Sequence, residues 1–260
     1  MLSKARIKLI HSLDQKKGRR KEGLFVAEGH KLVGELMLAG HKPTYLCHTE
    51  QWQADTTTLA SNVTLSCPID LITENELRSA SFLQHPQQVL ALFPLPTWQP
   101  PKTEDLKDKL ILALDGVQDP GNLGTICRLA DWFGIEDILC SHETADIFNP
   151  KAIQATMGAI ARVKVHYTDL AAFVSKTSLE NIPIYGTFLD GENIYGKELC
   201  NKGLIIMGNE GNGISKECSA LVNERLFIPN YPAGCETSES LNVSVATAII
   251  CSEFRRRIEQ

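Results

Sequence analysis

The sequence predicts an α/β protein with two domains, of which the larger, C-terminal one is built on a mostly parallel sheet with helices on both faces. Its 260 residues, 43% of them hydrophobic, suffice for one large or two modest domains with ample core. Short apolar runs alternate with helical patterns along most of the chain, which is the order of elements that such sheets need. Residues 94–105 contain four prolines and no apolar periodicity. We therefore predict a first domain at 1–95, a linker at 96–108 and a second domain at 109–260.

The first domain is expected to combine short helices with short strands. Residues 2–13 have apolar side chains at helical spacing, and residues 29–39 are also expected to be helical. Between them lies a basic segment with two glycines, residues 14–23, which we expect to be a loop. The expected strands are residues 24–27, 44–47, 62–65 and 89–93. These elements make one small α/β domain.

The second domain contains six apolar runs that alternate with helical patterns. The expected strands are residues 110–114, 135–140, 163–167, 184–188, 204–207 and 226–228. Their near-continuous apolar character suits parallel strands that are covered on both faces. In open sheets of this type, ligands bind outside the carboxyl ends of the strands. The loops that follow these strands are therefore the expected place of a ligand site.

The charge of the chain is uneven. The formal net charge is −5, which argues against a protein that coats nucleic acid with its whole surface. Residues 1–42 nevertheless hold ten Lys and Arg against four Asp and Glu, so this end carries +6 and the remainder −11. The densest group of cations is Lys16, Lys17, Arg19, Arg20 and Lys21. This group is either part of a solvated turn or a segment that contacts the phosphates of a nucleic acid.

Several features are not expected from the sequence, namely a metal site, a disulfide framework and a membrane segment. The eight cysteines have no C-x-x-C spacing, so we expect neither a metal site nor a disulfide framework, and free thiols suit a cytoplasmic protein. All seven histidines lie at or before His166, so the last part of the chain has no imidazole base of its own. No apolar run reaches the roughly 18 residues that a membrane helix requires, so we expect no membrane segment.

Three loops after expected strands are rich in glycine and polar side chains. They are residues 115–128, residues 207–215, and the C-terminal segment from 226, whose polar cluster at 237–242 precedes the final helix. Glycines at strand ends let the backbone approach a ligand closely. The polar side chains that we single out in these loops are Asn122, Arg128, Glu210, Ser240 and Asn242.

Simpler interpretations of these residues stay open. Ser240 and Asn242 are common capping residues and would then serve only the final helix. Glu210 would then bond only to neighbouring backbone N–H groups. Neither glycine loop has the spacing of a P-loop or of a Rossmann turn, and Glu210 would repel a pyrophosphate. A cofactor without phosphates that carries a positive centre therefore fits these loops better than ATP or a dinucleotide.

Three ordered motifs resemble those of a known family. They are Asn122-x-Gly124-x-x-x-Arg128 with Phe133-Gly134, then Ile206-Met-Gly-Asn-Glu-Gly-x-Gly213, then Ile228-Pro229 and Ser240-Leu-Asn-Val-Ser-Val-Ala246. This set is similar to the motifs of the SpoU/TrmH family of RNA 2′-O-ribose methyltransferases in the SPOUT superfamily. Residues 23–32 also resemble the substrate-binding domain attached to many members. Two departures are the long loop at 228–240 and Gln154, where an arginine is expected.

The resemblance implies a fold and a set of partners. It implies a deep trefoil knot in the C-terminal SPOUT domain, although knots are essentially absent from proteins in general. It also implies S-adenosylmethionine bound in a bent form in the knot, a homodimer with active sites near the subunit interface, and an RNA substrate. We expect ribosomal RNA rather than tRNA, because the attached N-terminal domain is commoner among the rRNA enzymes of the family.

The resemblance also assigns roles to residues. Arg128 is expected to be the central catalytic residue, and we favour phosphate clamping and alkoxide stabilisation over a role as base, because a guanidinium has a pKa above about 12. Asn122, Ser240 and Asn242 would hold Arg128 and the ribose in place, and Glu210 would anchor its loop or accept the proton. The expected cofactor contacts are Thr187, Gly208, Asn209, Ile228, Pro229 and Leu241. The expected RNA contacts are the five cations at 16–21.

Two other functions remain open from the sequence. A catalytically inactive RNA-binding or assembly factor would keep the same fold, although all five polar motif residues are present. Methylation of a base by a SPOUT enzyme is disfavoured by the Asn/Arg and Ser-Leu-Asn motifs.

Overall fold

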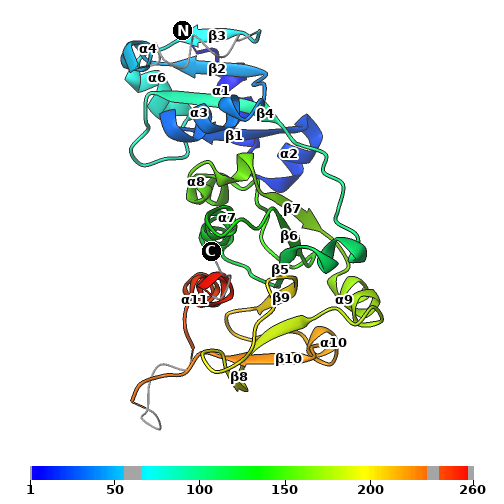
Figure 1. The fold of residues 1–260 in the computed structure, drawn as a ribbon. Coiled ribbons are helices and arrows are strands. Elements are labelled where there is room, and N and C mark those ends of the chain that lie inside the picture. Colours follow the sequence, from blue (N-terminus) through cyan, green and yellow to red (C-terminus); the bar gives the residue numbers. More distant parts are fainter. Residues whose placement is uncertain (1, 56–65, 233–239, 257–260) are drawn as a thin grey trace. The chain divides into compact units, whose positions relative to one another are not determined.

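The computed structural model describes residues 2–55, 66–232 and 240–256 of the chain (Figure 1). By its internal contacts the chain divides into two compact units. Unit 1 comprises Met1–Thr97 and Asp146–Arg162, and unit 2 comprises Trp98–Ala145 and Val163–Gln260. No helix in the described part of the chain is long and apolar enough to cross a membrane.

Unit 1 contains a four-stranded mixed sheet. Its strands are β1 (Leu24–Glu28), β2 (Tyr45–His48), β3 (Ile69–Leu71) and β4 (Val89–Pro94), in the order β1-β4-β2-β3. β4 is antiparallel to β1 and β2, whereas β3 is parallel to β2. Its helices are α1 (Lys4–Ser12), α2 (Lys16–Glu22), α3 (His30–Leu38), α4 (Glu50–Asp55), α6 (Glu74–Ala80), α8 (Pro150–Thr156) and the 3-10 turn η2 (Ala159–Ala161). The strands expected at 24–27, 44–47 and 89–93 are confirmed, whereas the one expected at 62–65 lies outside the described residues.

One expectation for unit 1 is wrong, because most of the basic segment at 14–23 is the helix α2 and not a loop. Gly23 ends this helix in the left-handed conformation, with a φ of 67°. Gly18, which suggested a break, allows α2 to pack against the end of α1, since a Cβ at this position would lie 1.8 Å from the carbonyl oxygen of Ser12. Lys, Arg and Glu are good helix formers, so the composition of the segment favours a helix once this contact is made.

Residues 146–162 pack with unit 1, although the predicted domain limits place them in the C-terminal domain. Within this segment, α8 contacts β1. The Phe148 ring contacts the Phe25 ring, with 5.1 Å between the centroids, and Arg162 forms a 2.6 Å ion pair with Glu35. The chain thus leaves unit 2 after β6, adds a helix to unit 1 and returns before β7.

Unit 2 is built on a six-stranded, fully parallel sheet, which confirms the predicted parallel architecture. The strands are β5 (Leu110–Asp115), β6 (Asp137–Cys140), β7 (Lys164–Tyr167), β8 (Ile184–Asn193), β9 (Gly203–Gly208) and β10 (Glu224–Phe227), in the order β10-β8-β9-β5-β6-β7. The helices are α7 (Pro120–Trp132), α9 (Leu170–Ser178), α10 (Lys216–Ser219), α11 (Val243–Arg256) and the 3-10 turn η1 (Thr103–Lys107). Figure 1 shows α7 and α11 on one side of the sheet and α9 and α10 on the other.

Both faces of this sheet are covered by apolar side chains. On one face, Ile111 and Ala113 of β5 belong to the same buried cluster as Val174 of α9 and Cys218 of α10. On the other face, α11 contacts α7 and β9. Each fully buried aliphatic side chain of this kind stabilises the fold by roughly 1.5–3 kcal/mol. The continuous apolar runs of the sequence are therefore explained by two-sided burial.

The strand order brings the predicted loops to one edge of the sheet. β9 lies between β5 and β8, so the carboxyl ends of β5, β9, β8 and β10 are neighbours. In the β5–β9 pair, Asp115 at the end of β5 is opposite Gly208 at the end of β9. β8 pairs with β9 as far as Gly186, so Thr187 is the first residue beyond this pairing. A ligand site is expected at such an edge.

Candidate active site

The loops after β5 and β9 are joined by hydrogen bonds at the carboxyl edge. The Asp115 carboxylate accepts a 2.8 Å hydrogen bond from the backbone N–H of Ser215. The Asn209 side-chain amide donates a 2.7 Å hydrogen bond to the backbone carbonyl of Gly116. Gly116 has a φ of 78°, a conformation that favours glycine. The first two glycine loops of the sequence therefore form one connected structure.

The loop after β9 is folded tightly over Gly208. A Cβ at Gly208 would lie 2.3 Å from the carbonyl carbon of Gly213 and 2.4 Å from the backbone nitrogen of Ile214, so no side chain fits at this position. The backbone groups of Asn209 and Gly213 exchange two 2.9 Å hydrogen bonds. The Asn209 side-chain oxygen accepts from the backbone N–H groups of Gly211 and Asn212. Asn209 therefore uses its polar atoms to shape the loop.

A chain of side-chain hydrogen bonds connects all three predicted loops. The Asn242 amide donates to the Asn122 carbonyl oxygen at 3.0 Å, and the Asn122 amide donates to a Glu210 carboxylate oxygen at 2.9 Å. Asn122 lies in the first turn of α7, Glu210 in the loop after β9, and Asn242 directly before α11. We call Asn242, Asn122 and Glu210 the amide relay.

The direction of the amide relay is set by the start of α11. The Asn242 side-chain oxygen accepts from the backbone N–H groups of Ser244 and Val245 at 3.0 and 3.3 Å, and also from the Ser244 hydroxyl. Because this oxygen caps the helix, the nitrogen of the same amide faces Asn122, whose own nitrogen then faces Glu210. Asn242 thus caps α11 with its oxygen and bonds Asn122 with its nitrogen. Among the residues that the structure describes, Glu210 accepts its side-chain hydrogen bond from Asn122 rather than from a neighbouring backbone N–H group.

The start of α7 is fixed by a cap that the sequence analysis did not single out. The Asp119 carboxylate accepts a 2.9 Å hydrogen bond from the backbone N–H of Asn122, and Pro120 occupies the first turn. An Asp-Pro pair that precedes a helical pattern is a recognisable start signal, so Asp119 could have been found. At the other end of α7, the Arg255 guanidinium donates to the carbonyls of Phe133 and Gly134 at 2.7 and 3.2 Å. α7 and α11 are therefore joined near both ends.

Arg128 and Ser240 are exposed and lie close in sequence to members of the amide relay. Arg128 lies on α7, and within the described ranges its guanidinium has neither a hydrogen-bond nor an ion-pair partner. Ser240 directly precedes the exposed Leu241 and the capping residue Asn242. A solvent-facing guanidinium without a partner among the described residues is suited to contact an anionic group of a substrate.

The remaining predicted cofactor contacts lie at the same edge of the sheet. Thr187 follows the part of β8 that pairs with β9, and Ile228 and Pro229 directly follow β10. These residues are half-buried, and Leu241 at the end of the third loop is 47% exposed. Backbone groups at this edge and one carboxylate, Glu210, suit a ligand with a positive centre and without phosphates.

The predicted RNA-contacting residues divide into two groups. Lys16, Lys17, Arg20 and Lys21 are exposed on α2. The prediction is wrong for Arg19, which is 2% exposed. Its guanidinium forms a 2.6 Å ion pair with Asp146 and donates to the carbonyls of Leu13 and Asp14 at the end of α1, each at 2.7 Å.

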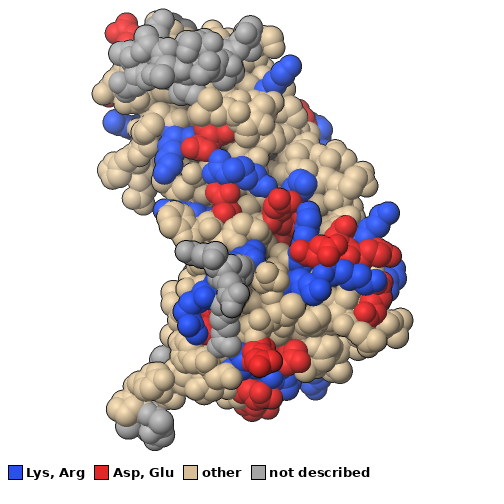
Figure 2. Space-filling view, in the orientation of Figure 1, with Lys and Arg blue, Asp and Glu red and all other residues tan. Residues whose placement is uncertain are grey.

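α2 carries exposed cations at high density. Figure 2 shows Lys and Arg interspersed with Asp and Glu on the face that it draws. Four exposed cations within one short helix, Lys16, Lys17, Arg20 and Lys21, are thus a local concentration of positive charge.

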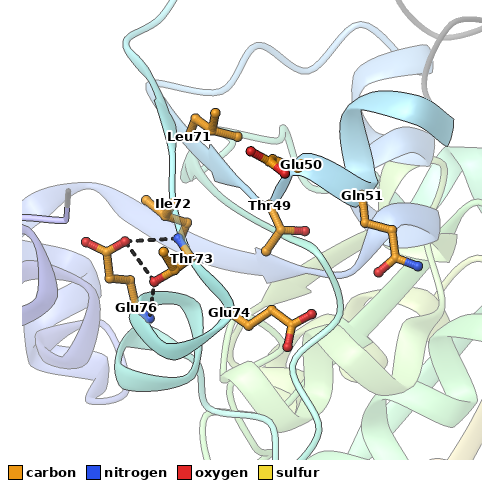
Figure 3. A pocket seen from close by; sticks show the side chains of 8 residues that line it. All are labelled: Thr49, Glu50, Gln51, Leu71, Ile72, Thr73, Glu74 and Glu76. Atoms are coloured by element: carbon orange, nitrogen blue, oxygen red, sulfur yellow. Dashed lines mark hydrogen bonds between the residues drawn. The ribbon is translucent and has the colours of Figure 1, made fainter.

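A cavity in unit 1 is not part of this site (Figure 3). It is lined by Thr49, Glu50, Gln51, Leu71, Ile72, Thr73, Glu74 and Glu76. Glu76 uses its carboxylate to cap α6, accepting from the backbone N–H and the hydroxyl of Thr73. The carboxylates at its wall do not suit the phosphates of a nucleic acid.

The structure is thus an α/β protein with polar, hydrogen-bonded loops at the carboxyl edge of a parallel sheet. Residues 109–252 match the SpoU rRNA Methylase family, and residues 4–91 match the MRM3-like substrate binding domain. The first match covers more than half of the chain, which therefore belongs to the SpoU rRNA methylase family. The family consists of RNA methyltransferases that take the methyl group from S-adenosylmethionine.

Similar proteins match almost the whole length of the chain. The 23S rRNA (guanosine(2553)-2′-O)-methyltransferase RlmP of Bacillus subtilis is 29% identical over 96% of this chain and 96% of its own. The structure of a TrmH-family protein from Porphyromonas gingivalis is 40% identical with a TM-score of 0.84 and covers 99% of both chains. The structure of an rRNA methyltransferase from Sinorhizobium meliloti with bound AdoMet is 27% identical with a TM-score of 0.83, over 100% of this chain and 97% of that one.

Proposed function

We propose that this chain transfers the methyl group of S-adenosylmethionine to a ribose 2′-hydroxyl of ribosomal RNA. The observation that carries the proposal is the amide relay, which joins the three motif loops at the carboxyl edge of the sheet. The relatives named as 23S rRNA 2′-O-methyltransferases support ribosomal RNA as the substrate class. The guanosine at position 2553 is part of the name of the Bacillus subtilis protein alone.

The cofactor site is formed by the ends of β8, β9 and β10 and the start of α11. S-adenosylmethionine supplies an electrophilic methyl group on a sulfonium centre. The backbone at Gly208 and at Ile228 and Pro229 would hold it together with Thr187 and Leu241, because backbone N–H and C=O groups recognise adenosine without charged side chains. The absence of a side chain at Gly208, enforced by the adjacent Gly213 backbone, keeps the loop closed over this edge.

The side chains around the relay orient the ribose and stabilise charge. Arg128 would hold the phosphate beside the target hydroxyl and stabilise the developing alkoxide, since its guanidinium stays protonated. Glu210, fixed by Asn122, anchors its loop or accepts the proton of the hydroxyl. Ser240 would donate to the ribose from the start of α11. Orientation of this kind is a large part of catalysis when the cofactor brings its own electrophile.

The proposal includes a knotted chain path and a homodimer. β9 enters the sheet between two strands that precede it in sequence, β5 and β8, and α11 then contacts α7. This order of elements supports a trefoil knot at the C-terminal end. Trp132 on α7 is 83% exposed and Val245 on α11 is 49% exposed. Apolar side chains exposed on two adjoining helices support a subunit interface at this face.

The RNA would be held mainly by unit 1. α2 presents Lys16, Lys17, Arg20 and Lys21 to solvent, and exposed cations of this density bind phosphates through release of counterions. Seven cysteines in the described residues are free, which supports a reducing compartment such as the cytoplasm.

Labelled methyl transfer to separated rRNA and tRNA pools tests the proposal. We expect label in rRNA and, after alkaline hydrolysis, in fragments that resist cleavage beside the methylated ribose. Label that appears only in fully hydrolysed nucleotides would indicate base methylation. Binding of RNA without any transfer would indicate an inactive assembly factor.

A further inference from the structure

The pairing of β8 with β10 skips five residues in the middle of β8, and we call these residues, 187–191, the excursion. Gly186 is opposite Arg225 of β10, and Glu192 is opposite Leu226, so adjacent residues of β10 pair with residues on either side of 187–191. Thr187, the proposed cofactor contact, is the first residue of this excursion. Its position therefore depends on what holds residues 187–191.

The Phe188 ring is folded back over the preceding glycine. A Cβ at Gly186 would lie 2.7 Å from the Phe188 ring and 2.9 Å and 3.1 Å from methyl carbons of Val222 and Ile214. The ring thus lies over Gly186 together with Val222 and Ile214, and it belongs to the periphery of the apolar cluster under α9 and α10. Ile214 is part of the loop that folds over Gly208. The excursion and this loop therefore share one packing contact.

Arg225 lies over the same ring. Its guanidinium carbon lies 3.5 Å from the Phe188 ring centroid, and its Nη2 forms a 2.5 Å ion pair with Asp190. At the end of the excursion, a Cβ at Gly191 would lie 2.6 Å from the backbone carbonyl carbon of Leu226, so the two backbones touch. One side chain of β10 thus contacts two residues of the excursion.

We infer that Arg225 is a positioning residue of the cofactor site, which it serves by clamping residues 187–191 against β10. We call Arg225, Phe188 and Asp190 the Arg225 clamp. Thr187 lies between Gly186, held in the sheet, and Phe188, held by the clamp, so its backbone direction is fixed before the cofactor arrives. Without the clamp, residues 187–191 populate other conformations. The apparent affinity for S-adenosylmethionine then falls in proportion to the fraction of molecules that keep the binding conformation. The inference rests on the proposed function, in which Thr187 contacts S-adenosylmethionine.

Calorimetric titration of the full-length protein with S-adenosylmethionine tests the clamp. Arg225→Ala removes a stacked cation and an exposed ion pair, and we expect affinity to fall roughly five- to tenfold. The KM for S-adenosylmethionine should rise by a similar factor, whereas kcat at saturating cofactor should stay at the wild-type value. Arg225→Lys keeps a charge for Asp190 but lacks the planar stack, so it should recover part of the affinity. Phe188→Leu, which keeps an apolar side chain over Gly186, should weaken binding in the same direction.

Lys109→Ala is the matched control, because Lys109 forms a surface ion pair with Glu136 and lies just before the amino end of β5, away from the site. We expect its affinity for S-adenosylmethionine to equal that of the wild type. Wild-type affinity in Arg225→Ala would refute the clamp and leave the proposed function intact. An equal loss in Arg225→Ala and Lys109→Ala would also refute it, as a general effect on stability. Failure of the wild-type protein to bind S-adenosylmethionine would instead overturn the proposed function, and the clamp with it.

Discussion

Asn242 caps α11 with its side-chain oxygen and holds Asn122 with its side-chain nitrogen, and the substitution Asn242→Asp separates these two roles. Asp is as good a capping residue as Asn, so the hydrogen bonds from Ser244 and Val245 are kept. The 3.0 Å hydrogen bond to Asn122 is lost, because a second carboxylate oxygen then faces the Asn122 oxygen. Asn122 can relieve this contact only by turning its amide, which brings its oxygen toward Glu210.

The magnitude follows from the exposure of the amide relay. One net hydrogen bond is worth about 0.5–1.5 kcal/mol, and two carboxylates that compete for one amide add a modest repulsion, because Asn242 and Glu210 are exposed and screened by solvent. A loss of about 1–2 kcal/mol in transition-state stabilisation corresponds to a fall in kcat/KM of roughly 5- to 30-fold.

Steady-state kinetics and thermal unfolding together test the effect of Asn242→Asp. Asn242→Asp should lower kcat/KM while the unfolding temperature stays near the wild-type value. Asn242→Ala, which also loses the cap, should lower the unfolding temperature as well, by the equivalent of about 0.5–2 kcal/mol. Wild-type kcat/KM in a folded Asn242→Asp protein would refute the reasoning, because Asn242 would then serve only as the cap of α11.

Three further changes probe other parts of the structure. Gly208→Val should weaken S-adenosylmethionine binding in calorimetry by at least about tenfold, since overpacking costs about 1–3 kcal/mol, whereas Gly196→Ala, where the nearest atom is 3.9 Å away, should not. Replacing Lys16, Lys17, Arg20 and Lys21 by Gln should weaken RNA binding and flatten its dependence on salt by about three units, with unchanged cofactor affinity; an unchanged slope would exclude α2 as the RNA contact. Arg19→Ala leaves Asp146 without its buried partner and should lower stability to urea by about 3–5 kcal/mol, while Arg20→Ala on the exposed side of α2 should have little effect.

The strands of unit 2 could be predicted because strands that are buried on both faces have continuous apolar sequences. Each of the six apolar runs became a strand, and the loops at their carboxyl ends met as the rule for open sheets requires. Asn122, Glu210 and Asn242 were found as candidates because polar residues beside glycines are conspicuous after apolar strands. Their hydrogen-bond directions were not predictable, since they depend on the cap of α11.

The errors in unit 1 come from contacts between distant residues. Gly18 looked like a helix breaker, because nothing local shows that the Ser12 carbonyl occupies the space of its missing side chain. Arg19 looked like its basic neighbours, because its partner Asp146 is far along the chain. Residues 146–162 lie between β6 and β7 in the sequence, and this position does not reveal that α8 packs with unit 1.

The most direct test of the account is the mass of the nucleosides from unmodified rRNA incubated with the purified protein and S-adenosylmethionine. After complete digestion, one nucleoside should gain a methyl group on its ribose, which fragmentation separates from a methyl group on the base. Arg128→Ala should abolish this product while calorimetry still detects binding of S-adenosylmethionine. A methyl group on a base, or a product that persists in Arg128→Ala, would contradict the account.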